Sequence, residues 1–262
     1  MSEKRKTICP LDCPDSCALL VTVDKGKVTK VEGDPEHDFT RGFICAKMRS
    51  YHQRVESKER ILHPLLRTGE KGSGEFKSIT WEEAWEMLVD RLSEIKRKYG
   101  GQSVLPYSYA GNMGHLSRTA GSAFFNKFGA SHLEETICSA TAKAGWKAHM
   151  GDFPGTAPHQ AKDAKLIVAW GINVKSTNIH FWPMIHHCRK NGGKLLVIDP
   201  YKTITAKAAD YYFPVKPGGD AALALGALKS LCEKNRCDQS FIRSQITGFD
   251  ELAENQKKVQ WE

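Results

Sequence analysis

The sequence lacks any apolar run approaching the ~20 residues that are needed to cross a bilayer. Its amino terminus lacks the basic, apolar and small-residue regions of a secretory signal, and it carries no twin-arginine leader. These absences predict a cytoplasmic protein without a membrane span. Disulfides are disfavoured in that compartment, so the eight cysteines are expected to ligate metal or to remain thiols.

The sequence also lacks internal repeats, low-complexity tracts and a concentrated basic patch. The net charge is +8, but the lysines are scattered and only short basic runs occur, at 4–6 and 96–98. This pattern argues against nucleic acid as a partner and is typical of a solvated face, although a basic rim around an anionic cofactor is compatible with it. The 262 residues, 40% apolar and 26% charged, suffice for one large core or two modest ones.

Four of the cysteines are spaced as metal ligands. Cys9, Cys13 and Cys17 follow C-x3-C-x3-C spacing on a segment rich in Pro and Asp, which favours a loop over a helix, and Cys45 follows after a gap of 27 residues. Three near cysteines and one remote cysteine are a recurring way to ligate the four irons of a cubic iron–sulfur cluster. Zinc is the alternative, but structural zinc sites more often present two separated pairs.

The residues around Cys45 carry a resemblance. The run 42–49 reads G-F-I-C-A-K-M-R and sets Lys47 two residues past the last ligand. Together with the cysteine spacing, this run resembles the amino-terminal cluster segment of the molybdenum or tungsten bis-pterin oxidoreductases, which include formate dehydrogenases, nitrate reductases and dimethyl sulfoxide reductase. The resemblance implies a 4Fe–4S cluster, and it implies that Lys47 lies between that cluster and the nearer pterin. By residue type alone Lys47 would be a solvated surface lysine.

Local patterns predict the elements of the first half. Residues 18–23 and 28–33 are expected to form two strands around a tight turn, a small β unit that carries the cysteine loop. A capping box at 80–83 begins a helix that should run from 81 to 99 with one face in the core. A strand is expected at 103–107, with Pro106 at its edge, and a short helix at 121–128.

Cys138 precedes a predicted Ala-rich helix. The amino terminus of a helix favours a thiolate, although a single cysteine is more often a small buried hydrophobic residue. The context I-C-S-A-T-A-K-A-G resembles the family position that supplies the protein ligand to molybdenum or tungsten. The resemblance therefore assigns Cys138 to the metal.

The pattern of the second half predicts an α/β domain. Residues 165–171 and 194–200 are near-continuous apolar runs typical of central parallel strands, and a helix is expected between them at 181–190. A further short strand ends near 213 and leads into a helix at 221–233. The fold class is therefore α/β, with a small amino-terminal β unit followed by a Rossmann-like parallel sheet. No G-x-G-x-x-G run occurs, so a nicotinamide or flavin fingerprint is absent.

Polar residues and glycines follow these strands. The candidates for cofactor binding are Gly171, Asn173, Asp199, Pro200, Gly218 and Asp220. Backbone N–H groups at glycine-rich turns suit a pyrophosphate, and an acidic residue after a strand suits a ribose or a base edge. Their order resembles the family segments that bind one molybdopterin guanine dinucleotide, with the asparagine near the phosphates and the aspartates at ribose and guanine. The alternative for Asp220 is a simple helix cap.

Two domains are predicted, a cluster domain at 1–65 and a molybdopterin-guanine-dinucleotide-binding domain at 66–262, which is incomplete relative to the family. We expect a truncated chain, a gene fragment or a split subunit that needs the remainder of the catalytic subunit. The resemblance implies a small-molecule substrate and an electron-carrier protein or subunit as further partners, and any NAD would bind elsewhere. Such an oxidoreductase passes electrons between the metal site and the cluster, and this fragment alone is expected to be inactive.

Two other functions stay open. One is an electron-transfer or scaffold subunit that keeps the cluster but has lost the pterin, against which Cys138, Asn173 and Asp220 argue. The other is a non-redox hydratase on the same fold, with Asp12 and Asp15 as candidate acids, although both are typical turn residues. The three remaining cysteines fit no ligand spacing with one another and are expected to be buried or free thiols: Cys188, Cys232 and Cys237.

Overall fold

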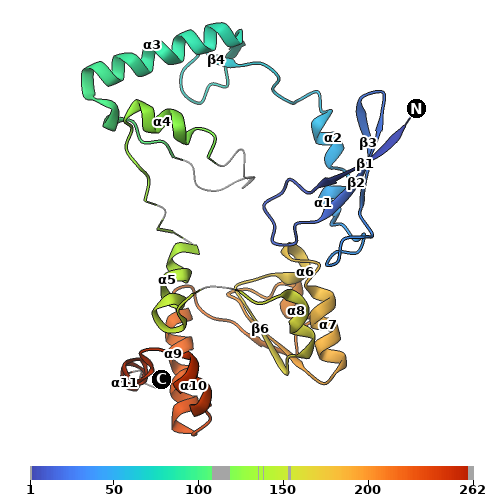
Figure 1. Cartoon of the computed structure of the whole chain (residues 1–262), viewed down its shortest axis with the longest axis vertical. Coiled ribbons are helices and arrows are strands. Elements are labelled where there is room, and N and C mark those ends of the chain that lie inside the picture. Colours follow the sequence, from blue (N-terminus) through green and yellow to red (C-terminus); the bar gives the residue numbers. More distant parts are fainter. Residues whose placement is uncertain (1, 108–118, 135, 138, 153–154, 259–262) are drawn as a thin grey trace. The chain divides into compact units, whose positions relative to one another are not determined.

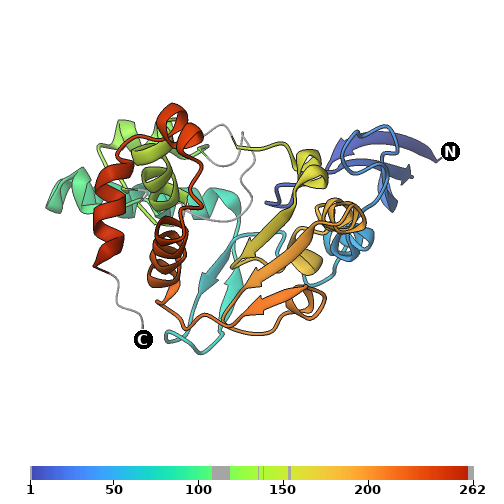
Figure 2. The ribbon, with the colours of Figure 1, turned by 90° about the horizontal axis from the view of Figure 1, so that it is seen from below.

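The computed structural model describes residues 2–107, 119–134, 136–137, 139–152 and 155–258 (Figure 1). The contacts divide the chain into two compact units. The first comprises Met1–Asp12 and Ser16–Glu135, and the second comprises Cys13–Asp15 and Thr136–Glu262. Figure 2 shows the same ribbon from a second direction.

The first unit begins with a three-stranded antiparallel sheet in the order β1-β2-β3, formed by β1 (Glu3–Ile8), β2 (Ala18–Asp24) and β3 (Lys27–Gly33). Lys25 and Gly26 join β2 to β3 with φ angles of 50° and 79°. Two successive left-handed residues are what a two-residue hairpin turn needs to match the twist of its strands. The predicted β unit is confirmed, and β1 adds a third strand to it.

The rest of this unit is built from short elements and one long helix. They are α1 (Ala46–Arg49), α2 (Tyr51–Val55), the antiparallel pair β4 (Leu65–Arg67) and β5 (Phe76–Ser78), α3 (Trp81–Tyr99), the 3₁₀ helix η1 (Gly101–Ser103) and α4 (Ser122–Phe128). The capping box is present, because the Glu83 N–H donates to Thr80 Oγ1 and the Thr80 N–H donates to the Glu83 carboxylate. The sequence prediction for the start of α3 is therefore confirmed.

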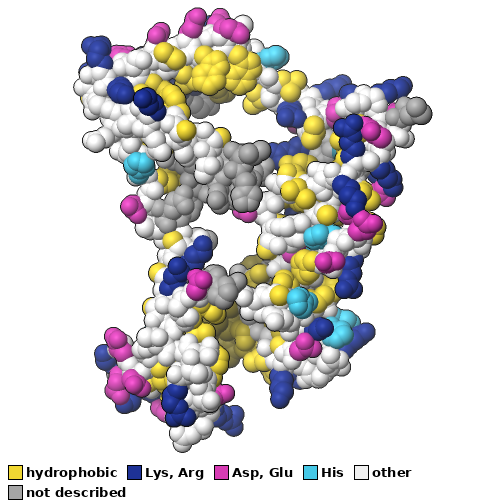
Figure 3. All heavy atoms as spheres, in the orientation of Figure 1, with side chains coloured by type: hydrophobic (Ala, Val, Ile, Leu, Met, Phe, Trp, Pro, Cys, Tyr) yellow, Lys and Arg dark blue, Asp and Glu magenta, His cyan; other side chains and the backbone are white. Residues whose placement is uncertain are grey.

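The apolar side of α3 differs from the prediction. We expected one face of the helix to be core, yet none of its residues is buried and Leu88 is 50% exposed. Trp81 and Trp85 pack on each other with ring centroids 6.5 Å apart, and hydrophobic side chains gather over α3 in Figure 3. Among the described residues of this unit, the element that α3 chiefly contacts is η1.

No strand forms at 103–107, where one was predicted. Ser103 ends η1, and the residues after it are irregular, although the Val104 carbonyl accepts a hydrogen bond from the Ser131 N–H at 2.9 Å. Pro106 has no N–H to donate to a neighbouring strand, which is the physical reason that the apolar run does not pair.

The second unit contains a three-stranded parallel sheet in the order β6-β7-β8, formed by β6 (Leu166–Trp170), β7 (Lys194–Ile198) and β8 (Tyr211–Phe213). The connections include α6 (Val174–Thr177), α7 (Trp182–Lys190) and α8 (Ile204–Lys207), of which α7 and α8 contact β7 (Figure 1). The mixed α/β class, with a small antiparallel sheet followed by a parallel one, is confirmed.

The core of this unit lies between that sheet and its helices. Ile185, Leu195 and Val197 are fully buried and pack with Ala169, Val174 and Ala206. Burying apolar side chains of this size contributes about 1.5–3 kcal/mol each. Before the sheet come α5 (Ser139–Met150) and the 3₁₀ helix η2 (Pro158–Asp163), and after it come α9 (Asp220–Glu233), α10 (Gln239–Gln245) and α11 (Phe249–Lys257).

Asp210, just before β8, makes the stability of this unit depend on pH. Its carboxylate accepts the Leu195 N–H at 2.8 Å and pairs with Arg189 at 3.0 Å. These two contacts, the backbone hydrogen bond first, lower the pKa of Asp210 below its ordinary 3.8. Because the folded state holds this pKa down, the stabilisation is complete above pH 3.8 and is lost as the pH falls through the folded-state pKa.

We expect Asp210→Asn to be less stable than wild type near neutral pH and to approach wild type as the pH falls below about 3.8, because asparagine cannot gain a proton there. Urea unfolding midpoints of both proteins between pH 7 and pH 3 measure this. Two curves that stay parallel across that range would exclude Asp210 as the source of the pH dependence.

Candidate cluster loop and nucleotide-binding edge

Cys9 and Cys17 stand at the two ends of a loop that the β1–β2 pairing closes. Ile8 pairs with Ala18 at the end of the ladder, and the Cys9 N–H donates to the Cys17 carbonyl oxygen at 2.8 Å, which extends the pairing by one step. Cys17 is buried and Cys9 is half-buried. The loop between them therefore has fixed ends.

Cys45 returns to the same side of this sheet through a segment that requires glycine. A Cβ atom at Gly33 would lie 2.3 Å from the Gly42 carbonyl oxygen, and Gly42 itself has a φ of +79°. This close approach leads directly into Ile44 and Cys45, the latter at the amino-terminal boundary of α1. Gly33 and Gly42 thus fix the place at which Cys45 enters the unit.

Three of the four predicted ligands lie in or against one hydrophobic core of the first unit. Cys17 is buried with Leu19, Val31, Ile44 and Met48, and both Cys9 and Cys45 pack against that group. Cys9 Sγ lies 3.5 Å from Met48 Sδ, so α1 covers the loop end directly. An apolar surround of this kind is what controls solvent access to a cluster bound by cysteine.

Cys13, the fourth predicted ligand, is half-buried and stands on the short segment that belongs to the second unit. Within the part of the chain that the structure describes, no three His, Cys, Asp or Glu side chains are grouped as a metal site. Four cysteine thiolates are the donor set of a cubic iron–sulfur cluster, and the structure places Cys9, Cys17 and Cys45 in or against one hydrophobic core without grouping their side chains as metal ligands. The assignment of all four as ligands stays a prediction.

Lys47 lies on α1, two residues past Cys45, and is exposed. Cys138 lies outside the described residues, immediately before α5. The roles of both stay predictions.

Asp15 and His180 form a buried pair that sequence reasoning missed. His180 Nδ1 lies 2.7 Å from Asp15 Oδ2, and both side chains are at least 96% buried. Asp15 belongs to the segment Cys13–Asp15 of the cysteine loop, which packs in the same unit as His180. Because Asp15 is buried and paired, it is not placed to act as an accessible acid.

The candidates for cofactor binding gather at the carboxyl edge of the parallel sheet. The Gly171 N–H, just past β6, donates to the Ile198 carbonyl oxygen at the end of β7 at 2.8 Å. Asp199 follows β7 and donates its N–H to the Phe213 carbonyl at the end of β8 at 3.2 Å. Ligands bind at this edge in open α/β sheets, so the predicted positions share a suitable location.

Asn173 is held in place by a threonine. Thr205 is fully buried, donates its hydroxyl to Asn173 Oδ1 at 2.7 Å and accepts the Lys175 N–H at 3.0 Å. Because the amide oxygen of Asn173 is engaged, its NH₂ group is the part suited to a phosphate oxygen.

Replacing Thr205 with valine is expected to reduce the free energy of unfolding by about 2 kcal/mol, because two hydrogen bonds at a buried site lose their partner. Chemical denaturation measures the change. Thr177→Val is the matched control, since Thr177 is exposed and its hydroxyl donates to the main-chain carbonyl oxygen of Asn173 at 3.1 Å. The control is expected to lose less than about 0.5 kcal/mol. Equal losses would exclude the buried hydroxyl as the cause.

The two aspartates differ in their surroundings. Asp199 is 7% exposed, and its Oδ1 accepts the Tyr201 N–H at 3.1 Å, so the turn at Asp199 and Pro200 is fixed by its own side chain. Asp220 is the first residue of α9, and its Oδ1 accepts the indole N–H of Trp170 at 2.6 Å. Asp220 is therefore tied to the end of β6, and Gly219, not Asp220, occupies the cap position of α9.

Gly218 has a φ of +85°, and the N–H of the next residue closes a turn to the Lys216 carbonyl at 2.8 Å. This turn precedes α9 as the sequence predicted. Thr205 and Trp170, which position Asn173 and Asp220, were missed because their contacts span 32 and 50 residues of sequence.

Comparison with protein-family models gives two matches. The molybdopterin oxidoreductase model matches residues 60–254, and the molybdopterin oxidoreductase Fe4S4 domain model matches residues 2–57. In the part of the chain that the structure describes, no helix combines the length and the apolar character that a membrane crossing requires.

Several curated proteins are similar over nearly the whole chain. The chain is 42% identical to "Probable oxidoreductase YoaE" of Bacillus subtilis (strain 168) over 254 residues, covering 97% of this chain and 37% of that protein. It is 40% identical over 266 residues to "Probable oxidoreductase YyaE" of the same organism, covering 100% and 39%. The assimilatory nitrate reductase catalytic subunit of that organism is 29% identical, with coverage of 94% and 34%.

Among solved structures, acetylene hydratase from Pelobacter acetylenicus is similar, with a TM-score of 0.75 and 25% sequence identity. The match covers 97% of this chain and 35% of that structure. The chain thus spans well under half the length of each of these relatives.

Proposed function

The chain belongs to the molybdopterin oxidoreductase family, and from that premise we propose that it supplies the cluster and one nucleotide-binding half of a molybdenum or tungsten oxidoreductase. The two matched domains indicate a pterin-bound metal and a 4Fe–4S cluster as cofactors. When bound, the metal centre exchanges an electron pair with a small substrate, and the cluster carries electrons singly.

The observation that carries this proposal is that Cys9, Cys17 and Cys45 all lie in or against one hydrophobic core. The Cys9–Cys17 backbone hydrogen bond closes the base of the loop that bears Cys13. In this proposal the four cysteines hold the cluster, α1 shields it, and Lys47 bears a positive charge between it and the pterin. Cys138 supplies the protein ligand to molybdenum or tungsten.

The edge of the parallel sheet is proposed to bind the guanine dinucleotide part of one pterin cofactor in a Rossmann-like manner. Gly171 and Gly218 bring backbone close to the pyrophosphate, and Asn173 donates its NH₂ group to a phosphate oxygen. Asp199 and Asp220 accept hydrogen bonds from ribose or guanine, and Pro200 stiffens the turn after Asp199. We place the division between the cluster domain and the nucleotide domain at residues 65 and 66.

The partners and the location follow from the same proposal. The substrate is a small molecule, and nitrate, which is named for one of the relatives above, is a candidate. An electron-carrier protein or subunit and the remaining part of a catalytic subunit complete the reaction. A cytoplasmic location stays a prediction.

Metal analysis of anaerobically purified protein tests the proposal. About four iron and four acid-labile sulfide per chain are expected, together with a low-temperature electron paramagnetic resonance signal on reduction. One zinc without sulfide would contradict it. A cluster accompanied by no guanine nucleotide on acid extraction, from protein produced in a host that makes the pterin cofactor, would instead support the scaffold alternative.

A further inference from the structure

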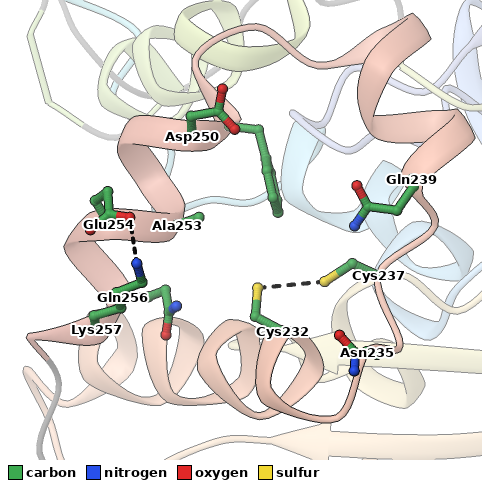
Figure 4. Close-up of a pocket in the computed structure, with 10 residues that line it drawn as sticks. Cys232, Asn235, Cys237, Gln239, Asp250, Ala253, Glu254, Gln256 and Lys257 are labelled. Atoms are coloured by element: carbon green, nitrogen blue, oxygen red, sulfur yellow. Dashed lines mark hydrogen bonds and ion pairs between the residues drawn. The ribbon is translucent and has the colours of Figure 1, made fainter.

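Two thiols outside the proposed site face each other across the end of a helix. Cys232 is the penultimate residue of α9, Cys237 lies in the turn before α10, and their Sγ atoms are 3.5 Å apart (Figure 4). An S–S bond is about 2.05 Å long, so the two sulfurs need to approach by only about 1.5 Å to form one.

The backbone fixes both cysteines in this arrangement. Asn235 adopts a left-handed conformation with a φ of 51°, and the Arg236 N–H donates to the Leu231 carbonyl oxygen at 2.9 Å, as in a helix-terminating turn. The Asp238 carboxylate then caps α10, accepting the N–H groups of Ser240 and Phe241 at 3.0 Å. The chain therefore returns Cys237 to Cys232 without any contribution from the thiols themselves.

A pocket of about 410 Å³ opens beside the thiols, between α9, α10 and α11 (Figure 4). Charged side chains of α11, those of Asp250, Glu254 and Lys257, line this pocket together with the two thiols. The pocket therefore has room beside the thiols for the polar organic group of a small disulfide.

We propose that Cys232 and Cys237 form a thiol–disulfide exchange site for a low-molecular-weight disulfide. The site is independent of the cluster and of the pterin. One cysteine thiolate attacks a sulfur of the small disulfide, forms a mixed disulfide and releases one thiolate. The other cysteine then attacks the protein sulfur, forms the Cys232–Cys237 bond and releases the second thiolate. Two electrons pass from the cysteines to the small disulfide, and the two cysteine protons go to the thiolates released.

Both thiols are half-buried, so burial does not distinguish them and either can make the first attack. The second attack joins two groups of the same chain and is accelerated by their proximity.

Peptide mapping of the full chain tests the exchange. The reduced protein is incubated anaerobically with glutathione disulfide, remaining thiols are alkylated, and tryptic peptides are analysed without reduction. Residues 230–234 and 237–243 should appear as one disulfide-linked pair and should separate again on incubation with excess reduced glutathione. Absence of the linked pair at every glutathione ratio would overturn the proposal.

Single variants test the mixed-disulfide intermediate. Cys232→Ser and Cys237→Ser should each accumulate a glutathione mixed disulfide at the remaining cysteine, because the second attack is blocked. Cys188→Ser, which removes a buried thiol elsewhere in the same unit, should form the 232–237 pair at the wild-type rate. Absence of the mixed disulfide in both single variants would overturn the two-step exchange.

Discussion

Cys45→Ser is expected to remove the iron–sulfur cluster, lowering iron and acid-labile sulfide from about four each to below about one per chain. Cys45 is the one proposed ligand outside the 9–17 loop, and it enters the site through the glycine contact at Gly33 and Gly42. Serine is a good residue for the amino-terminal boundary of α1, so the helix should persist when the thiol is lost. Metal and sulfide analysis of anaerobically purified protein measures the effect.

Cys188→Ser is the matched control for this variant. The Cys188 thiol is fully buried and donates to the Ala164 carbonyl oxygen at 2.9 Å, a bond that a serine hydroxyl keeps. The control should retain about four iron per chain. A Cys45→Ser protein with the full complement of iron and sulfide would remove Cys45 from the ligand set and reopen the zinc alternative at this site.

Elements with a local signal were predictable. The capping box at Thr80 needs only residues three apart, and the β2–β3 turn needs only two residues that tolerate left-handed backbone. The near-continuous apolar runs of β6 and β7 are typical of parallel strands, and both strands are present. The extent of burial was not predictable in the same way. The apolar stripe of α3 has the correct period for a core face, yet period does not say whether a partner covers it.

In the candidate site, too, only the features with a local sequence signal were predictable. Gly171, Asn173 and Asp199 were predictable as neighbours, because parallel strands that follow one another bring their carboxyl ends to one edge. Thr205 was not predictable as part of the site, since it stands 32 residues from Asn173, the residue that it positions. The thiols Cys232 and Cys237 fit no ligand spacing, and only the left-handed turn at Asn235 brings them together.

The Asp15–His180 pair shows most clearly which contacts the sequence alone cannot predict, because its partners are 165 residues apart. No periodicity or motif connects a turn residue in a cysteine loop with a histidine just before α7. The sequence offered only the turn-forming tendency of Asp15, and the structure gives that residue a buried partner instead of an exposed acidic role.

His180→Ala should reduce the free energy of unfolding by about 3 kcal/mol, because it leaves the Asp15 carboxylate buried without this partner. His180→Asn should recover part of the loss, since the asparagine NH₂ group occupies nearly the position of Nδ1 and can donate to Asp15. Urea unfolding of the three proteins, each with the same metal content, measures both effects.

His186→Ala provides the comparison for that measurement, because His186 lies on α7 of the same unit but is exposed. Its loss should stay below about 0.5 kcal/mol. If His180→Ala and His186→Ala were equally stable, the buried pair would not anchor the segment Cys13–Asp15. A rescue by His180→Asn would assign the stabilisation to the hydrogen bond to Asp15, because asparagine restores the donor without the imidazole ring.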